Sequence, residues 1–235
     1  MRGRYESFAA PDSVAFVGCS AGASAVVVTE AARASVRYSN ADTVVVAVGD
    51  SPSNLLTEQF AREGLVNWGI GSVLEDVTGW PNATEHLSEN LLSEAMGAVF
   101  SRHPSVQFAF YTRTADATQL FQYQTMGGMV DGLSDVDAMK VWNRQNLAML
   151  ESLQSAHSNF RIFVAEGAGH CAMTFDSALT NDGFKEWVEA LLLRGTSSGA
   201  GASSDNPPGV TCGTQCDALP SCCTFRSTCT SVLPR

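Results

Sequence analysis

The sequence predicts an α/β fold, in which a mostly parallel sheet is covered by helices on both faces. Short runs of β-branched and other apolar residues alternate along the chain with segments whose apolar residues recur at helical spacing, as expected of consecutive βαβ units. One of these runs, DTVVVAVGD at residues 42–50, is apolar between turn-forming ends, which is typical of a strand buried on both faces. The chain has 235 residues and is 45% hydrophobic, enough for one sizeable core.

The first strand is expected at residues 14–20, VAFVGCS, and the alanine-rich residues 21–38 are expected to form a helix. After the strand at residues 42–50 the pattern is mixed as far as residue 103, with a helix expected at residues 86–101. The remaining predicted elements follow in chain order: a strand at residues 106–116, a helix at 135–156, a strand at 160–167 and a helix at 182–194.

The composition changes after residue 194. Residues 195–209, GTSSGAGASSDNPPG, indicate a flexible linker, and residues 210–235 form a small Cys-rich tail. The seven cysteines are Cys19, Cys171, Cys212, Cys216, Cys222, Cys223 and Cys229. Because the tail has neither a CxxC pair nor a histidine, disulfides are favoured over a zinc site, with the pairing left open. The odd count means that one thiol is free, pairs between chains, or has a partner outside this sequence.

The charge of the chain argues against several classes of partner. The net charge is -10 and no basic run is present, so neither nucleic acid nor an anionic membrane surface is an expected partner. No apolar stretch reaches the roughly 18 to 20 residues that span a bilayer, and the N-terminus lacks an apolar signal core. The cysteines and the sequon at Asn82 are nevertheless consistent with secretion.

The segment GCSAG joins the first predicted strand to the first predicted helix, and Ser20 lies at its centre. A GxSxG segment in that position is a nucleophile elbow, in which glycines leave room for a sharp turn that exposes the serine. The helix that follows directs backbone N–H groups at a developing oxyanion, and Ala21 N–H is the first of these donors. The alternative is a glycine-softened junction with no chemical role.

A serine nucleophile needs a base and an orienting acid, expected at later strand ends in the order Ser, acid, His. Of the four histidines, only His170 follows a predicted strand end, in AEGAGHCAM. His86 and His157 lie in helical, polar surroundings, and His103 precedes a proline in a loop.

For the acid, Asp116 closes the strand-like segment VQFAFYTRTAD, and Asp50, at the end of the preceding strand, is its main rival. A carboxylate at a strand end can also be only a helix N-cap. Three further aspartates lie in a loop that could reach inward, with nothing to single one out: Asp131, Asp135 and Asp137.

The segments GCSAG, VGDSPSNLL, YTRTADATQLFQYQ and GHC together resemble the pectin acetylesterase family, which includes the Notum carboxylesterases. The similarity spans residues 14–175. It implies an α/β-hydrolase-like fold with Ser20 as nucleophile, Asp116 as acid and His170 as base. It also implies that Asp50 corresponds to an aspartate that the family keeps near the site, which we expect to bind substrate.

Two departures from the family pattern are visible. Plant members continue the elbow with a second glycine, where this chain has Ala23, and no Gly-Gly-Gly-Trp type motif that supplies oxyanion contacts is present. The resemblance therefore implies an N-terminally truncated member, with residues 1–194 forming the C-terminal part of the catalytic domain. The sheet would then lack its early strands and leave the elbow strand with an open apolar edge.

The expected function is that of a secreted serine carboxylic-ester hydrolase acting on acylated polysaccharide, with no metal or organic cofactor. One alternative keeps the chemistry and takes a fatty acyl group on a protein as substrate, as Notum does. The other is a catalytically impaired module, anchored through the Cys-rich tail to cell-wall material or to another protein.

Overall fold

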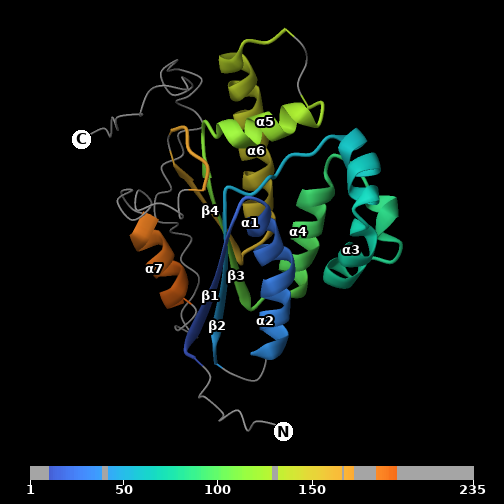
Figure 1. The fold of residues 1–235 in the computed structure, drawn as a ribbon. Helices are drawn as coiled ribbons and strands as arrows, with labels where there is room; N and C mark the ends of the chain where they lie inside the picture. Colours follow the sequence, from blue (N-terminus) through green and yellow to red (C-terminus); the bar gives the residue numbers. More distant parts are fainter. Residues whose placement is uncertain (1–10, 39–41, 129–131, 166, 172–183, 195–235) are drawn as a thin grey trace, which may run out of the picture.

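Four parallel strands form the sheet in the order β1-β2-β3-β4 (Figure 1). They are β1 (Ser13–Cys19), β2 (Val44–Asp50), β3 (Val106–Arg113) and β4 (Phe160–Ala165). The structure is a computed structural model and describes residues 11–38, 42–128, 132–165, 167–171 and 184–194. The predicted linker at 195–209 and the Cys-rich tail lie outside these residues.

The strand register brings all four carboxyl ends to one edge of the sheet. Cys19 pairs with Asp50, Asp50 with Tyr111, and Arg113 with Ala165. Segments that leave the strands at these points therefore start side by side. We call this the carboxyl edge of the sheet.

Helices cover both faces of the sheet, which confirms the predicted α/β fold (Figure 1). One face carries α1 (Ala21–Ala25), η1 (Val26–Glu30), α2 (Ala31–Arg37), α4 (Leu91–Arg102) and α6 (Asp135–Ala156). The opposite face carries α7 (Phe184–Arg194). Four other helical segments complete the described chain: η2 (Phe60–Leu65), α3 (Ile70–Thr78), η3 (Ala83–His86) and α5 (Ala117–Thr125).

Alternation along β3 builds the two layers of the core. Phe108 and Phe110 face α4 and α6. The Phe108 ring packs 4.5 Å from that of Phe100 on α4, and the Phe110 ring packs 5.2 Å from that of Phe160 on the neighbouring strand β4. Tyr111 faces the other way, towards Phe163 and α7. Successive strand residues point to opposite faces, so a strand that is apolar at both odd and even positions packs into the core on both sides of the sheet.

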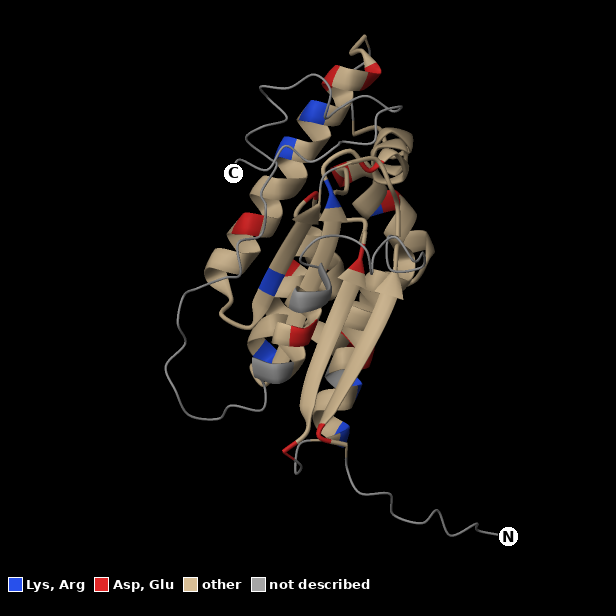
Figure 2. Cartoon of the chain, turned by 90° about the vertical axis from the view of Figure 1, so that its left-hand side faces the viewer, with Lys and Arg blue, Asp and Glu red and all other residues tan. Residues whose placement is uncertain are grey.

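Strand β1 is the least covered of the four. Its residues alternate between exposed and partly buried, and Val17 is 48% exposed. By contrast, every residue of β2 is buried, as predicted for a strand covered on both faces. Charged residues lie mainly on the helices and connections, and the strands are almost free of them (Figure 2).

Several predicted boundaries differ from the observed ones. The helix predicted at residues 86–101 starts at Leu91, since residues 83–86 form a 3-10 turn after Asn82, which has left-handed backbone dihedrals. The strand predicted at 106–116 ends at Arg113, because Asp116 already caps α5. The helix predicted at 21–38 has a π-helical segment, η1, in its middle.

Within the described residues, no helix is both long and apolar enough to cross a membrane.

Candidate active site

Ser20 lies on a sharp turn between β1 and α1. Its φ of 56° and ψ of -123° are unusual for a residue with a side chain and cost of order 1–3 kcal/mol. Two hydrogen bonds hold this conformation: Ser20 N–H donates to the Asp50 carbonyl, and Ala23 N–H donates to the Ser20 carbonyl, both at 2.9 Å. The GxSxG segment therefore has the strand–turn–helix context in which a serine is presented at the carboxyl edge.

The two glycines of the elbow have different roles. A Cβ on Gly18 would lie 2.2 Å from the Gly22 carbonyl oxygen, so the strand and the first helical turn approach too closely for any side chain there. A Cβ on Gly22 would meet nothing within 4 Å. Steric crowding thus explains the first glycine of the segment and not the second.

Asp116 and His170 form a hydrogen-bonded pair at the same edge. His170 Nδ1 lies 2.8 Å from Asp116 Oδ2. Because a carboxylate only accepts, Nδ1 carries the proton and Nε2 presents its lone pair in the neutral ring. Nε2 is buried and has no hydrogen-bond partner among the described residues. An imidazole nitrogen in this state is available to take a proton from a substrate or a nucleophile.

The Asp116 carboxylate is fully buried, and four donors hold it. Its Oδ1 accepts from the backbone N–H groups of Thr118 and Gln119, as an N-cap of α5. Its Oδ2 accepts from Gln119 Nε2 at 2.9 Å and from His170. Asp116 is therefore both a helix cap and the partner of the histidine, and the cap fixes the direction of the oxygen that His170 uses.

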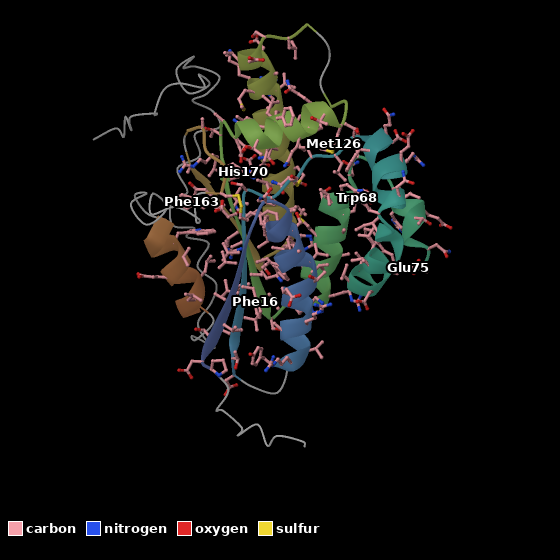
Figure 3. All side chains as sticks on the ribbon, viewed as in Figure 1. Phe16, Trp68, Glu75, Met126, Phe163 and His170 are labelled. Atoms are coloured by element: carbon pink, nitrogen blue, oxygen red, sulfur yellow. A yellow bond between two sulfur atoms is a disulfide. The ribbon has the colours of Figure 1, made fainter. Side chains whose placement is uncertain are left out.

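The segment of residues 167–171 crosses the carboxyl edge from the β4 end back to β1. It first meets the loop after β3, where Ala115 N–H donates to the Gly167 carbonyl and Asp116 holds His170. At the loop after β2, Cys171 N–H donates to Ser51 Oγ. At the end of β1, a disulfide joins Cys171 to Cys19 with a Cα–Cα distance of 5.4 Å. We call this segment the crossing loop (Figure 3).

The disulfide brings the backbones of Ser20 and His170 close together, but Ser20 Oγ does not hydrogen-bond to His170 Nε2, which has no partner among the described residues. Cys19 directly precedes Ser20, and Cys171 directly follows His170. His170 lies at the strand ends close to this disulfide in Figure 3. Three non-glycine residues with positive φ meet here: Ser20, Ser51 and Cys171. Such strained residues concentrate at functional sites and persist where the surroundings fix them, as the disulfide and hydrogen bonds do here.

Asp50 lies beneath the crossing loop and is fully buried. Its Oδ1 accepts from Ser51 Oγ, which in turn accepts from Cys171 N–H. The hydrogen bond to Asp116 is the main cause that raises the pKa of His170 above 6.5, and the charges of Asp116 and Asp50 add to it, against desolvation. The charge of Asp50 thus helps to raise the pKa of His170, and its hydrogen bond to Ser51 connects it to the crossing loop. That Asp50 binds substrate stays a prediction.

Ala21, the predicted oxyanion donor, is the first residue of α1 and is exposed. The helical segments α1, η1 and α2 follow one another without a break from Ala21 to Arg37, so the free N–H groups of this end share the positive end of their combined dipole. This position fits the stabilisation of a negative oxygen next to Ser20.

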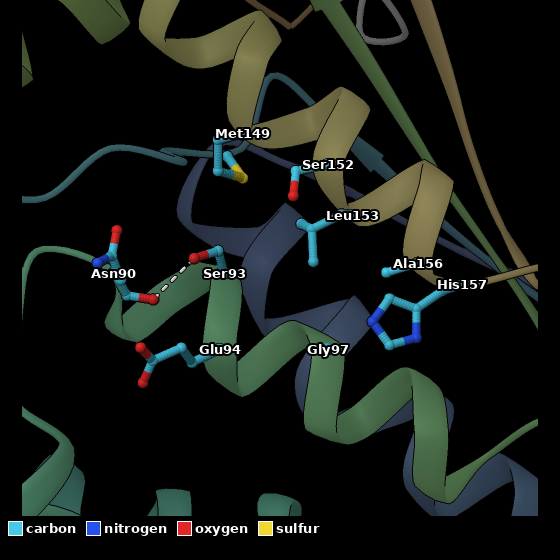
Figure 4. A pocket seen from close by; sticks show the side chains of 9 residues that line it. All are labelled: Asn90, Ser93, Glu94, Gly97, Met149, Ser152, Leu153, Ala156 and His157. Atoms are coloured by element: carbon cyan, nitrogen blue, oxygen red, sulfur yellow. Dashed lines mark hydrogen bonds between the residues drawn. The ribbon is translucent and has the colours of Figure 1, made fainter.

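The other three histidines lie elsewhere. The His86 ring stacks on Trp80 at 4.3 Å, and His103 Nδ1 lies 2.8 Å from Ser35 Oγ. His157 lines a depression of about 390 Å³ between α4 and α6, which no residue of the predicted triad lines (Figure 4). Burial lowers the pKa of both His103 and His157. His170 alone among them has a carboxylate partner.

The described aspartates that could have replaced Asp116 as the acid lie on another element. Asp135 and Asp137 lie in the first turn of α6, where Ser134 caps the helix and its hydroxyl donates to Asp137. Asp131 lies outside the described residues. The geometry therefore pairs His170 with Asp116 among the described candidates.

The sequence does not predict three of the interactions at the site, although Gln119 lies in one of the segments that carry the family resemblance. Gln119 orients the acid, and Ser51 links Asp50 to the crossing loop. The Cys19–Cys171 disulfide is the third, since the pairing had been left open. Its signal was present in the sequence: each cysteine is the immediate neighbour of a candidate catalytic residue.

A scan against protein-family models, a search of curated proteins and a search of solved structures each found no match to this chain. The proposal below therefore depends on the geometry of the site and on the motifs in the sequence.

The glycine pair of the elbow gives a direct test of the local geometry. We expect Gly18→Ala to lower the free energy of unfolding by about 1–3 kcal/mol, because its Cβ meets a backbone carbonyl that cannot move without the helix. The matched control, Gly22→Ala, should leave stability unchanged or raise it by up to about 1 kcal/mol, since alanine is the better helix former. Urea denaturation measures both. Equal stability of the two variants would contradict the close approach.

The raised pKa of His170 makes stability depend on pH. A raised folded-state pKa stabilises the fold below the unfolded value of about 6.5, and this contribution is lost as pH rises through the folded-state pKa. We expect Asp116→Asn, which keeps a good N-cap, to lower the pKa of His170 and to remove that pH-dependent contribution. NMR titration of the imidazole measures the pKa of His170, and urea denaturation at pH values below and above that pKa measures its contribution to stability. An unchanged His170 titration in the variant would contradict the pairing.

Proposed function

We propose that the chain is a serine carboxylic-ester hydrolase that removes O-acetyl groups from cell-wall polysaccharide such as pectin, outside the cell. The observation that carries the reaction type is the oriented Asp116–His170 pair, held by the crossing loop next to the strained turn of Ser20. A nucleophile, a base and an orienting acid from three strand ends are the minimum set for acyl transfer through an acyl-enzyme.

In the proposed reaction, Ser20 Oγ attacks the ester carbonyl while His170 Nε2 takes the hydroxyl proton. Asp116 keeps the proton on Nδ1 and stabilises the imidazolium. Ala21 N–H donates to the oxyanion of the tetrahedral intermediate. His170 then returns the proton to the departing sugar alcohol. Water, activated by the same nitrogen, attacks the acyl-enzyme and releases acetate and free Ser20.

Two observations support Nε2 as the base. It is buried without a hydrogen-bond partner among the described residues, and Asp116 and Asp50 favour its protonated form. The cation that forms during attack is therefore stabilised by two buried carboxylates.

The substrate class depends on the resemblance to the pectin acetylesterase family, carried by GCSAG at Ser20, by the segment YTRTADATQLFQYQ that contains Asp116, and by GHC at His170. The disulfide is compatible with an oxidising compartment outside the cell, and Asn82 of the sequon is exposed.

Covalent labelling tests the nucleophile. A fluorophosphonate should modify Ser20 and no other residue, and mass spectrometry of the digested chain locates the adduct. We expect Ser20→Ala to abolish labelling and His170→Ala to slow it by about 10²–10⁴, the usual contribution of a general base. The matched control is His103→Ala, which should label at the parent rate. An adduct at another residue would refute the assignment, as would an intact Ser20 in a folded chain. The rates on acetyl and longer-chain nitrophenyl esters then separate an acetylesterase from a fatty-acyl esterase.

Ser51 is expected to position the base. Ser51→Ala removes two buried hydrogen bonds, one accepted from Cys171 N–H and one donated to Asp50. We therefore expect kcat on a nitrophenyl acetate to fall about tenfold, which corresponds to about 1.4 kcal/mol. KM should stay within about twofold, and the apparent pKa in the pH–rate profile should shift. The control is Ser53→Ala, on the same loop but bonded to Gln122. Identical profiles for the two variants would rule out this role.

A further inference from the structure

We propose that reduction of the Cys19–Cys171 disulfide turns the carboxyl edge into a binding site for a borderline-soft divalent metal ion such as Zn²⁺. The ligands are Cys19 Sγ, Cys171 Sγ and His170 Nε2. The ligand set is independent of the hydrolase proposal, and only its consequence for hydrolysis depends on that proposal.

The three residues already place candidate ligand atoms close together. Cys19 Sγ, Cys171 Sγ and a ring nitrogen of His170 all lie within 4.8 Å of one another. In a tetrahedral zinc site with bonds of 2.0–2.3 Å, ligand atoms are about 3.5–3.8 Å apart. Once the sulfur–sulfur bond is broken, small movements of the two thiolates and the ring therefore suffice. Cys19 and His170 are partly exposed, which leaves a path for the ion.

The surroundings of His170 match those of a metal-binding histidine. Its Nδ1 is bonded to Asp116 Oδ2 at 2.8 Å, so the nitrogen left for a metal is Nε2, which is buried and has no partner among the described residues. Histidine ligands usually have such a carboxylate on the second nitrogen, because it fixes the tautomer and raises the basicity of the first. The Asp116 carboxylate is held in turn by the Gln119 side chain and by the backbone N–H of Thr118.

The redox step is balanced with a dithiol as reductant. The disulfide accepts two electrons and two protons, its sulfur–sulfur bond breaks, and the dithiol becomes a cyclic disulfide. When the metal binds, the two cysteine thiols lose their protons to solvent. Three protein ligands leave a fourth position for water. If Ser20 is the nucleophile, the bound ion also occupies Nε2 of His170, the proposed base, and inhibits hydrolysis.

Metal binding to the full chain tests the proposal, in a background where the five tail cysteines are replaced by serine. The protein is reduced with a phosphine, because dithiols chelate zinc, and the reductant is then removed. Zn²⁺ affinity is measured by competition with a chromophoric chelator, and Co²⁺ absorption reports thiolate ligands. We expect one tight site in the reduced protein and none in the oxidised protein.

Four variants separate the site from adventitious binding. Cys19→Ser and His170→Ala should each weaken Zn²⁺ binding at least 100-fold. Asp116→Asn should weaken it about 10- to 100-fold, the usual effect of an outer-shell partner, and His103→Ala should not change it. Zn²⁺ should raise the Tm of the reduced protein, since an ion that binds only the folded chain stabilises it. The proposal is overturned by equal affinity in the oxidised protein, by undiminished affinity in His170→Ala or Asp116→Asn, or by a fall in Tm, which indicates binding to unfolded chain.

Discussion

The crossing loop is the constraint on which the rest of the candidate site depends. Strands β1 and β4 lie at opposite ends of the strand order, so the residues that follow them would not meet without a segment that runs back along the edge. Residues 167–171 make that return in five residues and are fixed to each neighbouring strand end in turn. Because hydrogen bonds and the disulfide fix this segment at three of the strand ends, His170 has little freedom of position.

The same constraint explains why strained backbone gathers at this edge. Ser20, Ser51 and Cys171 each adopt a positive φ, and each is tied to another of the strand ends by a hydrogen bond or by the disulfide. Conformations that are unfavourable for isolated residues persist when their surroundings fix them from several sides. A turn that presents a serine and a loop that presents an imidazole thereby stabilise each other.

The sequence predicted the four strands, the long helix at 135–156 and the pairing of Asp116 with His170, because these depend on local periodicity and on the rule that parallel strands end at one edge. It could not predict η1, because a helical spacing of apolar residues does not distinguish π-helical from α-helical hydrogen bonding. It also missed the true start of α4, because a 3-10 turn that follows left-handed dihedrals at Asn82 comes first. Ser51 was also out of reach: its role arises from a contact with Cys171, 120 residues away, which no local pattern encodes. Asp116 can be both the N-cap of α5 and the partner of His170, because its Oδ1 accepts from the backbone of α5 while its Oδ2 faces the imidazole.

The most direct measurement of the central claim is a crystal structure of the chain after reaction with a phosphonate ester. The account predicts phosphorus bonded to Ser20 Oγ, a phosphonyl oxygen accepting from Ala21 N–H, and His170 Nε2 within about 2.6–3.2 Å of Ser20 Oγ. Phosphorus on another side chain would contradict it, and so would an imidazole of His170 that is turned away from Ser20 while still bonded to Asp116.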